Sequence, residues 1–67
     1  MSERVTYDAM VEDYKSAKKL AIEIGSNDAR VFIGLRDGSN LLRCHLDRAE
    51  AERVVQKIQE AMKDADA

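Results

Sequence analysis

The sequence predicts a small α+β domain of order αββα, with two helices packed on one face of a β-hairpin. Two observations predict the helices, because apolar residues recur at helical spacing near both ends of the chain. A third predicts the hairpin, because two alternating apolar segments flank Asp37-Gly38, a pair typical of tight turns. With 67 residues, the chain is expected to form a single domain over residues 1–67.

The first helix is predicted over residues 6–24. Thr6 is a suitable N-cap, and Gly25 is a suitable residue just past the helix end. The expected apolar side consists of Tyr7, Met10, Val11, Tyr14, Ala17, Ala21 and Ile24. An alternative remains open, because alternating apolar residues also favour a short third strand over 20–24. Those residues are Leu20, Ile22 and Ile24.

The hairpin is predicted from strands over 30–36 and 41–46. Side chains alternate across a strand, so one register can gather every apolar group on a single face. These groups are Val31, Ile33, Leu35, Leu42, Cys44 and Leu46. A loop over 37–40 pairs Leu35 with Leu42 and buries the whole set, whereas a two-residue loop at Asp37-Gly38 pairs Leu35 with Asn40. We therefore expect the first register.

The second helix is predicted over residues 48–63. Asp47 is a suitable N-cap, and Glu50 follows at the spacing of a capping box. The apolar stripe consists of Ala51, Val54, Val55, Ile58, Ala61 and Met62. Both helices are expected to cover the apolar face of the hairpin with such stripes.

The opposite face of the hairpin is the predicted partner-binding site. Its residues are Arg30, Phe32, Arg36, Leu41, Arg43 and His45, with Gly34 between them. Arginine would supply charge-assisted hydrogen bonds and the two apolar groups would supply desolvated area, which favours a protein partner with an acidic surface. Three alternatives remain: the same face binds a nucleic acid by stacking and phosphate contacts, it is the dimer interface, or Phe32 and Leu41 only cover each other.

Catalysis is not expected, because Cys44 and His45 are neighbours on a strand and must point to opposite faces. The chain has one cysteine and one histidine, so neither a disulfide nor a four-ligand zinc site is predicted, and no cofactor is expected. A lone cysteine, the absence of an apolar leader and the absence of a long apolar segment favour a cytoplasmic protein without a membrane span.

Small size and charge bear on the partners. A chain of this length rarely gains enough stability from one core, and a two-stranded sheet would leave both edges open. A homodimer that joins two hairpins edge to edge is therefore expected. The formal net charge of −2 argues against a broad electrostatic footprint for nucleic acid. The predicted function is that of a non-catalytic interaction or regulatory protein.

Overall fold

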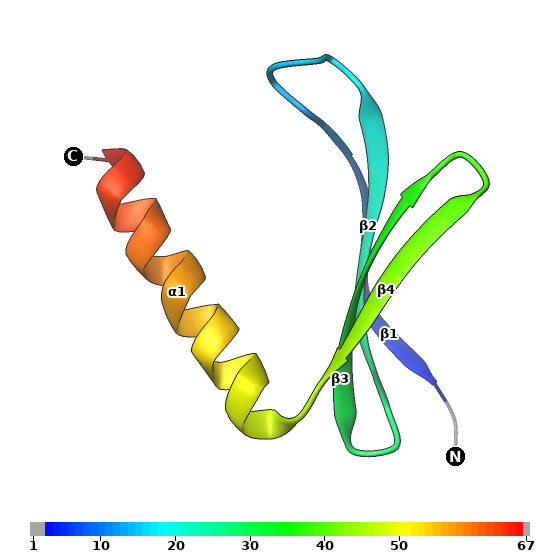
Figure 1. The fold of residues 1–67 in the computed structure, drawn as a ribbon, viewed down its shortest axis with the longest axis vertical. Helices are drawn as coiled ribbons and strands as arrows, with labels where there is room; N and C mark the ends of the chain where they lie inside the picture. The colour runs from blue at the N-terminus through cyan, green and yellow to red at the C-terminus, as the bar shows by residue number, and fades with distance from the viewer. Residues whose placement is uncertain (1–2, 67) are drawn as a thin grey trace.

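The computed structural model describes residues 3–66, which form a four-stranded antiparallel sheet followed by one helix (Figure 1). The strands lie side by side in chain order, so each connection is a hairpin. The elements are β1 (Arg4–Glu12), β2 (Lys19–Asn27), β3 (Arg30–Asp37), β4 (Asn40–Leu46) and α1 (Arg48–Asp66). The order is therefore ββββα, and the predicted αββα fold is wrong.

The predicted first helix over 6–24 is replaced by β1, a loop and most of β2. The alternative strand over 20–24 lies inside β2. Tyr7, Ala9 and Val11 also alternate, and they share one face of the sheet with their partners in β2. Tyr7, Met10 and Val11 fit one side of a helix, whereas Tyr7, Ala9 and Val11 fit one side of a strand. Because the segment satisfies both spacings, periodicity could not separate them. β2 also pairs with β3, which lies outside the predicted helix over 6–24. This pairing with a later part of the chain favours the strand over the helix.

Two residues assigned to helix ends have other roles. Thr6 lies at a β-bulge, where the register shifts between Val5 and Tyr7, and its hydroxyl donates a hydrogen bond to the carbonyl of Ile24 at 3.1 Å. Gly25 lies inside β2, opposite Phe32 of β3. Neither residue marks a helix boundary.

The predicted hairpin register is confirmed. Leu35 pairs with Leu42, and the other apolar partners follow in step along β3 and β4. The ladder extends one pair further than expected, to Asp37 and Asn40, so only Gly38 and Ser39 form the turn. Gly38 has a φ of 62°, the left-handed value required at the first position of a type II′ turn.

The C-terminal helix is confirmed and is three residues longer than predicted. The carboxylate of Asp47 accepts a hydrogen bond from the backbone N–H of Glu50 at 2.8 Å, which caps the first turn. Ion pairs three or four residues apart join Arg48 to Glu52, Arg53 to Glu50, and Lys57 to Glu60 on its solvent-exposed sides.

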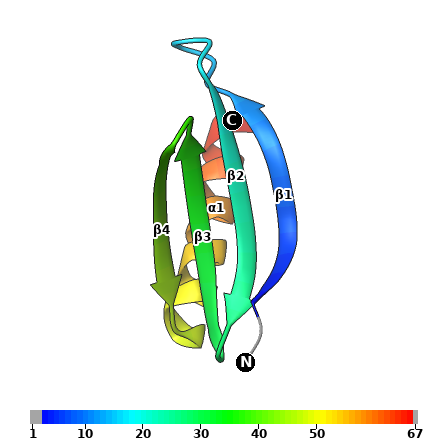
Figure 2. The same ribbon diagram turned by 90° about the vertical axis from the view of Figure 1, so that its right-hand side faces the viewer.

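The helix does not cover the sheet. In Figure 1, α1 starts beside the end of β4 and then diverges from the sheet, so that the two elements form an open V. Figure 2 shows the four strands in one layer with the helix behind them. No residue of α1 is buried, and Phe32 is the single fully buried large side chain among the described residues. The expectation that helices cover the apolar face is therefore wrong.

Candidate functional site

The two faces of the sheet have opposite chemistry, and cross-strand pairing fixes the membership of each. We call the face that carries Phe32 the polar face and the other the apolar face. The centre of the apolar face consists of Tyr7, Ala9, Val11, Leu20, Ile22, Ile24, Val31, Ile33, Leu35, Leu42, Cys44 and Leu46, and the polar residues Arg4, Ser26, Asp37 and Asn40 lie at its ends. Eleven of the twelve central residues come from the aliphatic, aromatic or alanine classes, and the twelfth is the cysteine.

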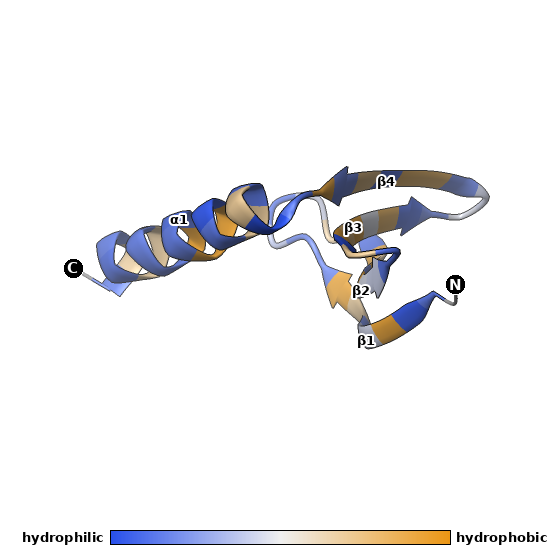
Figure 3. Cartoon of the chain, turned by 90° about the horizontal axis from the view of Figure 1, so that it is seen from below, coloured by the Kyte–Doolittle hydropathy of each residue, from blue (hydrophilic) through white to orange (hydrophobic). Residues whose placement is uncertain are grey.

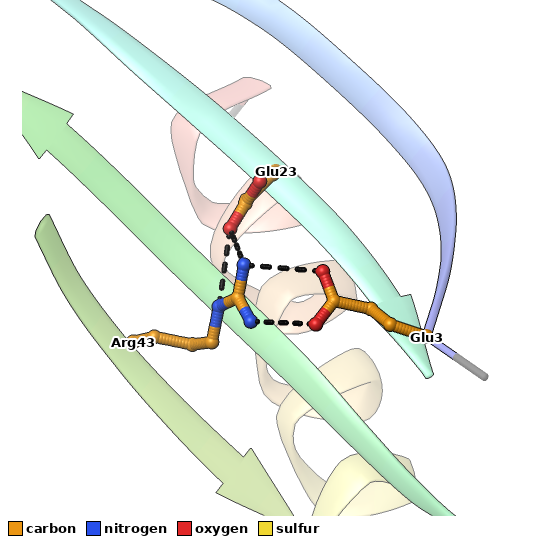
Figure 4. A network of polar contacts seen from close by, with 3 residues as sticks. All are labelled: Glu3, Glu23 and Arg43. Atoms are coloured by element: carbon orange, nitrogen blue, oxygen red, sulfur yellow. Dashed lines mark hydrogen bonds and ion pairs between the residues drawn. The ribbon is translucent and has the colours of Figure 1, made fainter. Parts of the chain in front are cut away.

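A charged cluster occupies the centre of the polar face (Figure 4). The guanidinium of Arg43 donates from Nε to a carboxylate oxygen of Glu23 at 3.1 Å, and from a terminal nitrogen to the same oxygen. It also donates two hydrogen bonds to the carboxylate of Glu3, at 3.0 and 3.4 Å. Hydrogen bonding to Glu23, and then to Glu3, raises the pKa of Arg43 above its usual value.

Glycine makes room for this cluster. Glu23, Gly34 and Arg43 lie in one row across β2, β3 and β4. Because Gly34 has no side chain, the carboxylate of Glu23 can cross above it to reach Arg43. A β-carbon at Gly34 would lie 3.0 Å from Cγ and Oε1 of Glu23. Gly34 is therefore covered by the ion pair between Glu23 and Arg43.

Arg43 also seals Phe32 from water. The central carbon of its guanidinium lies 4.2 Å from the centroid of the Phe32 ring, a cation–π geometry. The His45 ring lies beside it, with a centroid separation of 6.0 Å and an interplanar angle of 54°. The Phe32 side chain has 0% exposure as a result. Phe32 lies on the predicted face, but the expectation that its side chain is exposed there is wrong, because its neighbours on the same face close over it.

The remaining predicted site residues are placed as follows. Arg43 is largely covered and paired with two carboxylates, whereas Arg30, Arg36, Leu41 and His45 are exposed on the polar face. Leu41 is 51% exposed. These residues share a face as predicted, but the central pair of the proposed surface is buried or neutralised. A partner-binding role for the exposed four stays a prediction.

Carboxylates from β1, β2 and the residue before β1 balance the arginines of the hairpin. The polar face includes the acidic residues Glu3, Asp8, Glu12 and Glu23 and the basic residues Lys19, Arg30, Arg36 and Arg43. The basic character expected from the hairpin alone is cancelled at the level of the whole face. A charge-balanced surface attracts neither phosphates nor an acidic protein over a long range.

The apolar face, in contrast, is open. Leu42 is 73% exposed, and Tyr7, Ile24 and Leu35 are also exposed. The remaining large apolar residues on this face are only half-buried. Contiguous exposed apolar surfaces of this kind are typical of sites that contact another macromolecule or an apolar ligand.

The helix presents a second apolar surface, and Figure 3 shows its hydrophobic residues recurring along α1. Val55, Ile58 and Met62 are each exposed by more than half, although they belong to one stripe at helical spacing. The stripe also includes Ala51, Val54 and Ala61. An amphipathic helix whose apolar stripe faces water lacks the packing partner that normally stabilises it.

The two apolar surfaces meet in a crevice of about 700 Å³ near the start of the helix. Val31 of β3 lines one wall, and Ala51 and Val55 of α1 line the other. The helix therefore leaves the sheet on the side of the apolar face. We refer to the apolar face together with the helix stripe as the open apolar surface.

Half of the apolar face was not recognised as a surface in the sequence. Six of its twelve residues lie on β1 and β2, where a helix was predicted. The signal that could have found them is the alternation of Tyr7, Ala9 and Val11, which matches that of Leu20, Ile22 and Ile24. Two alternating segments joined by a polar loop are a hairpin pattern.

The neighbours Cys44 and His45 face opposite sides of β4, since one pairs with Ile33 and the other with Phe32. Cys44 therefore belongs to the apolar face and His45 to the polar face. Within residues 3–66, no three His, Cys, Asp or Glu side chains gather closely enough to bind a metal ion. Over the same residues, no helix has the length and hydropathy of a transmembrane span.

Comparison with known proteins gives no relative: no family model, curated protein or solved structure matches this chain.

Proposed function

We propose that this protein is a non-catalytic protein-interaction module, and that the open apolar surface is where it contacts its partner. The observation that carries the proposal is that Val31 of the apolar face and Ala51 and Val55 of the helix stripe line one crevice inside the V. The other apolar residues of both surfaces are left exposed or half-buried. Water contact with these side chains costs about 25 cal/mol for each Å² of apolar surface. A partner that fills the V removes this cost.

The polar face supports a partner contact less well than the apolar face. Its aromatic ring is sealed under Arg43, and its charges are paired or balanced. Side chains that are already covered would bury little further surface against a partner. The exposed side chains of Leu42 and Ile58 would be removed from water, which favours binding. The proposed site therefore lies on the side of the hairpin opposite to the one favoured by the sequence.

Leu41 and Leu42 offer a matched test, because these two exposed leucines are adjacent on β4 and face opposite sides. A photo-crosslinking amino acid is placed at position 41 or at position 42, and each protein is irradiated in its source cells. We expect covalent protein adducts from position 42 and few from position 41. Adducts from position 41 alone, adducts with nucleic acid, or no adducts from position 42 would contradict the proposal.

A further inference from the structure

We infer that the partner at the open apolar surface is a second copy of this chain, with α1 of each copy lying across the apolar face of the other. This inference rests on the proposed function and names the partner of the same site. A two-fold axis would relate the copies, so both contacts would be identical.

The first argument is that the surface is self-complementary. Each copy has a sheet face that lacks a helix and an amphipathic helix that lacks a sheet. The lengths also match: a helix of 19 residues spans about 28 Å. A strand of nine residues spans about 30 Å. A foreign partner would have to supply both missing halves, whereas a second copy already contains them.

The second argument is the amount of surface. The chain exposes 5610 Å². A folded monomer of 7.5 kDa is expected to expose about 4,200 Å². The excess of about 1,400 Å² exceeds the roughly 800 Å² that each partner buries in a standard interface. Doubled for two copies, it lies in the range of obligate homodimer interfaces. The subunits of such dimers often have no stable isolated fold.

The overall dimensions agree with the exposed area. The radius of gyration is 13.5 Å. A compact domain of this length is expected to have about 11 Å. The difference arises from the V between α1 and the sheet (Figure 1). An open V of this size is a shape that a second V can fill.

The third argument is charge. The core of the apolar face and the helix stripe carry no charged side chain, so packing one on the other covers mainly apolar groups. The crevice between them is bordered by Arg30 and by the Arg48–Glu52 ion pair. Charged residues lie only near the ends of this face, at Arg4 and Asp37, and Asp37 is already paired with Lys18 at 2.5 Å.

The helix reaches its own sheet less readily than that of a second copy. A single residue, Asp47, joins β4 to α1, and its carboxylate caps the helix through the N–H of Glu50. Closing the V within one chain would require rotation at Asp47, which would disturb this cap. The structure places only the first turns of α1 near β3 and β4, and the rest of the stripe stays free.

The first experiment measures mass by sedimentation equilibrium on the purified full chain at micromolar concentration. We expect twice 7.5 kDa for the wild type. Leu41→Lys should keep this mass, whereas Leu42→Lys should weaken association by at least about 30-fold, as expected when a charge enters an interface core. A wild-type protein that stays at the monomer mass would overturn the inference.

Because Leu42→Lys can also unfold the chain, a second experiment uses cross-linking that introduces no charge into the sheet. One chain keeps Cys44 as its only cysteine, and the other combines Cys44→Ser with Ile58→Cys. The two are mixed, refolded together and oxidised. We expect a covalent heterodimer, because the helix of one copy would then lie over Cys44 of the other.

Two companion variants, Val54→Cys and Met62→Cys, sample positions one turn away on the same stripe. Glu60→Cys, on the opposite side of α1, is the control and should give little product. Failure of all three stripe variants would overturn the inference. A third arrangement keeps Cys44 and Ile58→Cys in one chain: a bond that leaves the chain at monomer mass would mean that the V closes within one copy, which also overturns the inference.

The outcomes separate the inference from the proposed function. Photo-adducts from position 42 with a different protein, together with a monomeric purified chain, would remove the second copy and keep the interaction module. Absence of adducts from position 42 in cells would contradict both the inference and the proposed function.

Discussion

The ring of Phe32 lies over Gly25, its cross-strand partner in β2, so closely that the glycine cannot carry a side chain. A β-carbon on Gly25 would lie 2.5 Å from Cζ of Phe32 and would overlap the carbonyl oxygen of Arg4. The Phe32 ring is therefore enclosed between the backbone of Gly25 and the guanidinium of Arg43. The one sealed apolar contact of the sheet therefore depends on a glycine in the middle of a strand.

Substitution of Gly25 should damage the fold. Gly25→Ala forces the ring and the β1 backbone apart, and we expect a loss of about 1–3 kcal/mol in the free energy of unfolding. Urea denaturation followed by circular dichroism at fixed protein concentration measures it. Gly34→Ala is the matched control and should cost less, because the clash falls on the flexible Glu23 side chain. Equal losses would contradict the assignment of Phe32 to this pocket.

Truncation of Phe32 should be among the most damaging single changes in the sheet. Phe32→Ala empties the pocket between Gly25 and Arg43, and we expect a loss of about 3–5 kcal/mol. Leu41→Ala, on the same face but half exposed, should change the free energy of unfolding by less than about 1 kcal/mol. Comparable values for the two variants would place Phe32 on the surface after all.

Ala29 should be improved by glycine. The β2–β3 turn has φ values of 51° at Asp28 and 66° at Ala29, and this left-handed region is unfavourable for alanine. Ala29→Gly should raise the free energy of unfolding by about 1 kcal/mol. Ser39→Gly is the control, because Ser39 has no positive φ and glycine there should destabilise the chain. A loss of stability in Ala29→Gly would contradict this turn geometry.

Asp13 should titrate below the ordinary aspartate value. Its carboxylate accepts hydrogen bonds from the hydroxyl of Ser16 at 2.7 Å and from the Ser16 N–H at 3.2 Å, and these lower the pKa of Asp13 below 3.8. The stabilisation is therefore present above about pH 4 and is lost as the pH falls through the lowered pKa. Carboxyl-carbon NMR titration measures this pKa, and Ser16→Ala should return it toward 3.8. A wild-type value at or above 3.8 would refute the expectation.

Local patterns predicted the C-terminal half of the fold well. The register of β3 and β4 follows from alternation and a turn signal within residues 30–46, and α1 follows from Asp47 and one apolar stripe. These features depend on neighbours in sequence, so the sequence carries them directly. The same alternation separated the two faces of the hairpin and placed Cys44 and His45 on opposite sides.

The N-terminal half could not be predicted in this way. The residues over 6–24 satisfy a helical stripe and a pair of alternating strands, and only pairing with β3 distinguishes the two. The burial of Phe32 and the pairing of Arg43 could not be predicted for the same reason, because Gly25 and Glu23 of β2 and Glu3 before β1 supply the neighbours. A hairpin considered alone has no such neighbours.

The sequence by itself determined which side chains share a face within β3, β4 and α1, because strand and helix periods are fixed by backbone geometry. Only the tertiary structure decided which of the two faces is exposed to water. Non-local pairing brought Gly25, Glu23 and Glu3 against the hairpin and closed the polar face, while the single-residue connection at Asp47 held α1 away from the apolar face. Exposure depends on what packs above each residue, and periodicity in the chain does not contain that information.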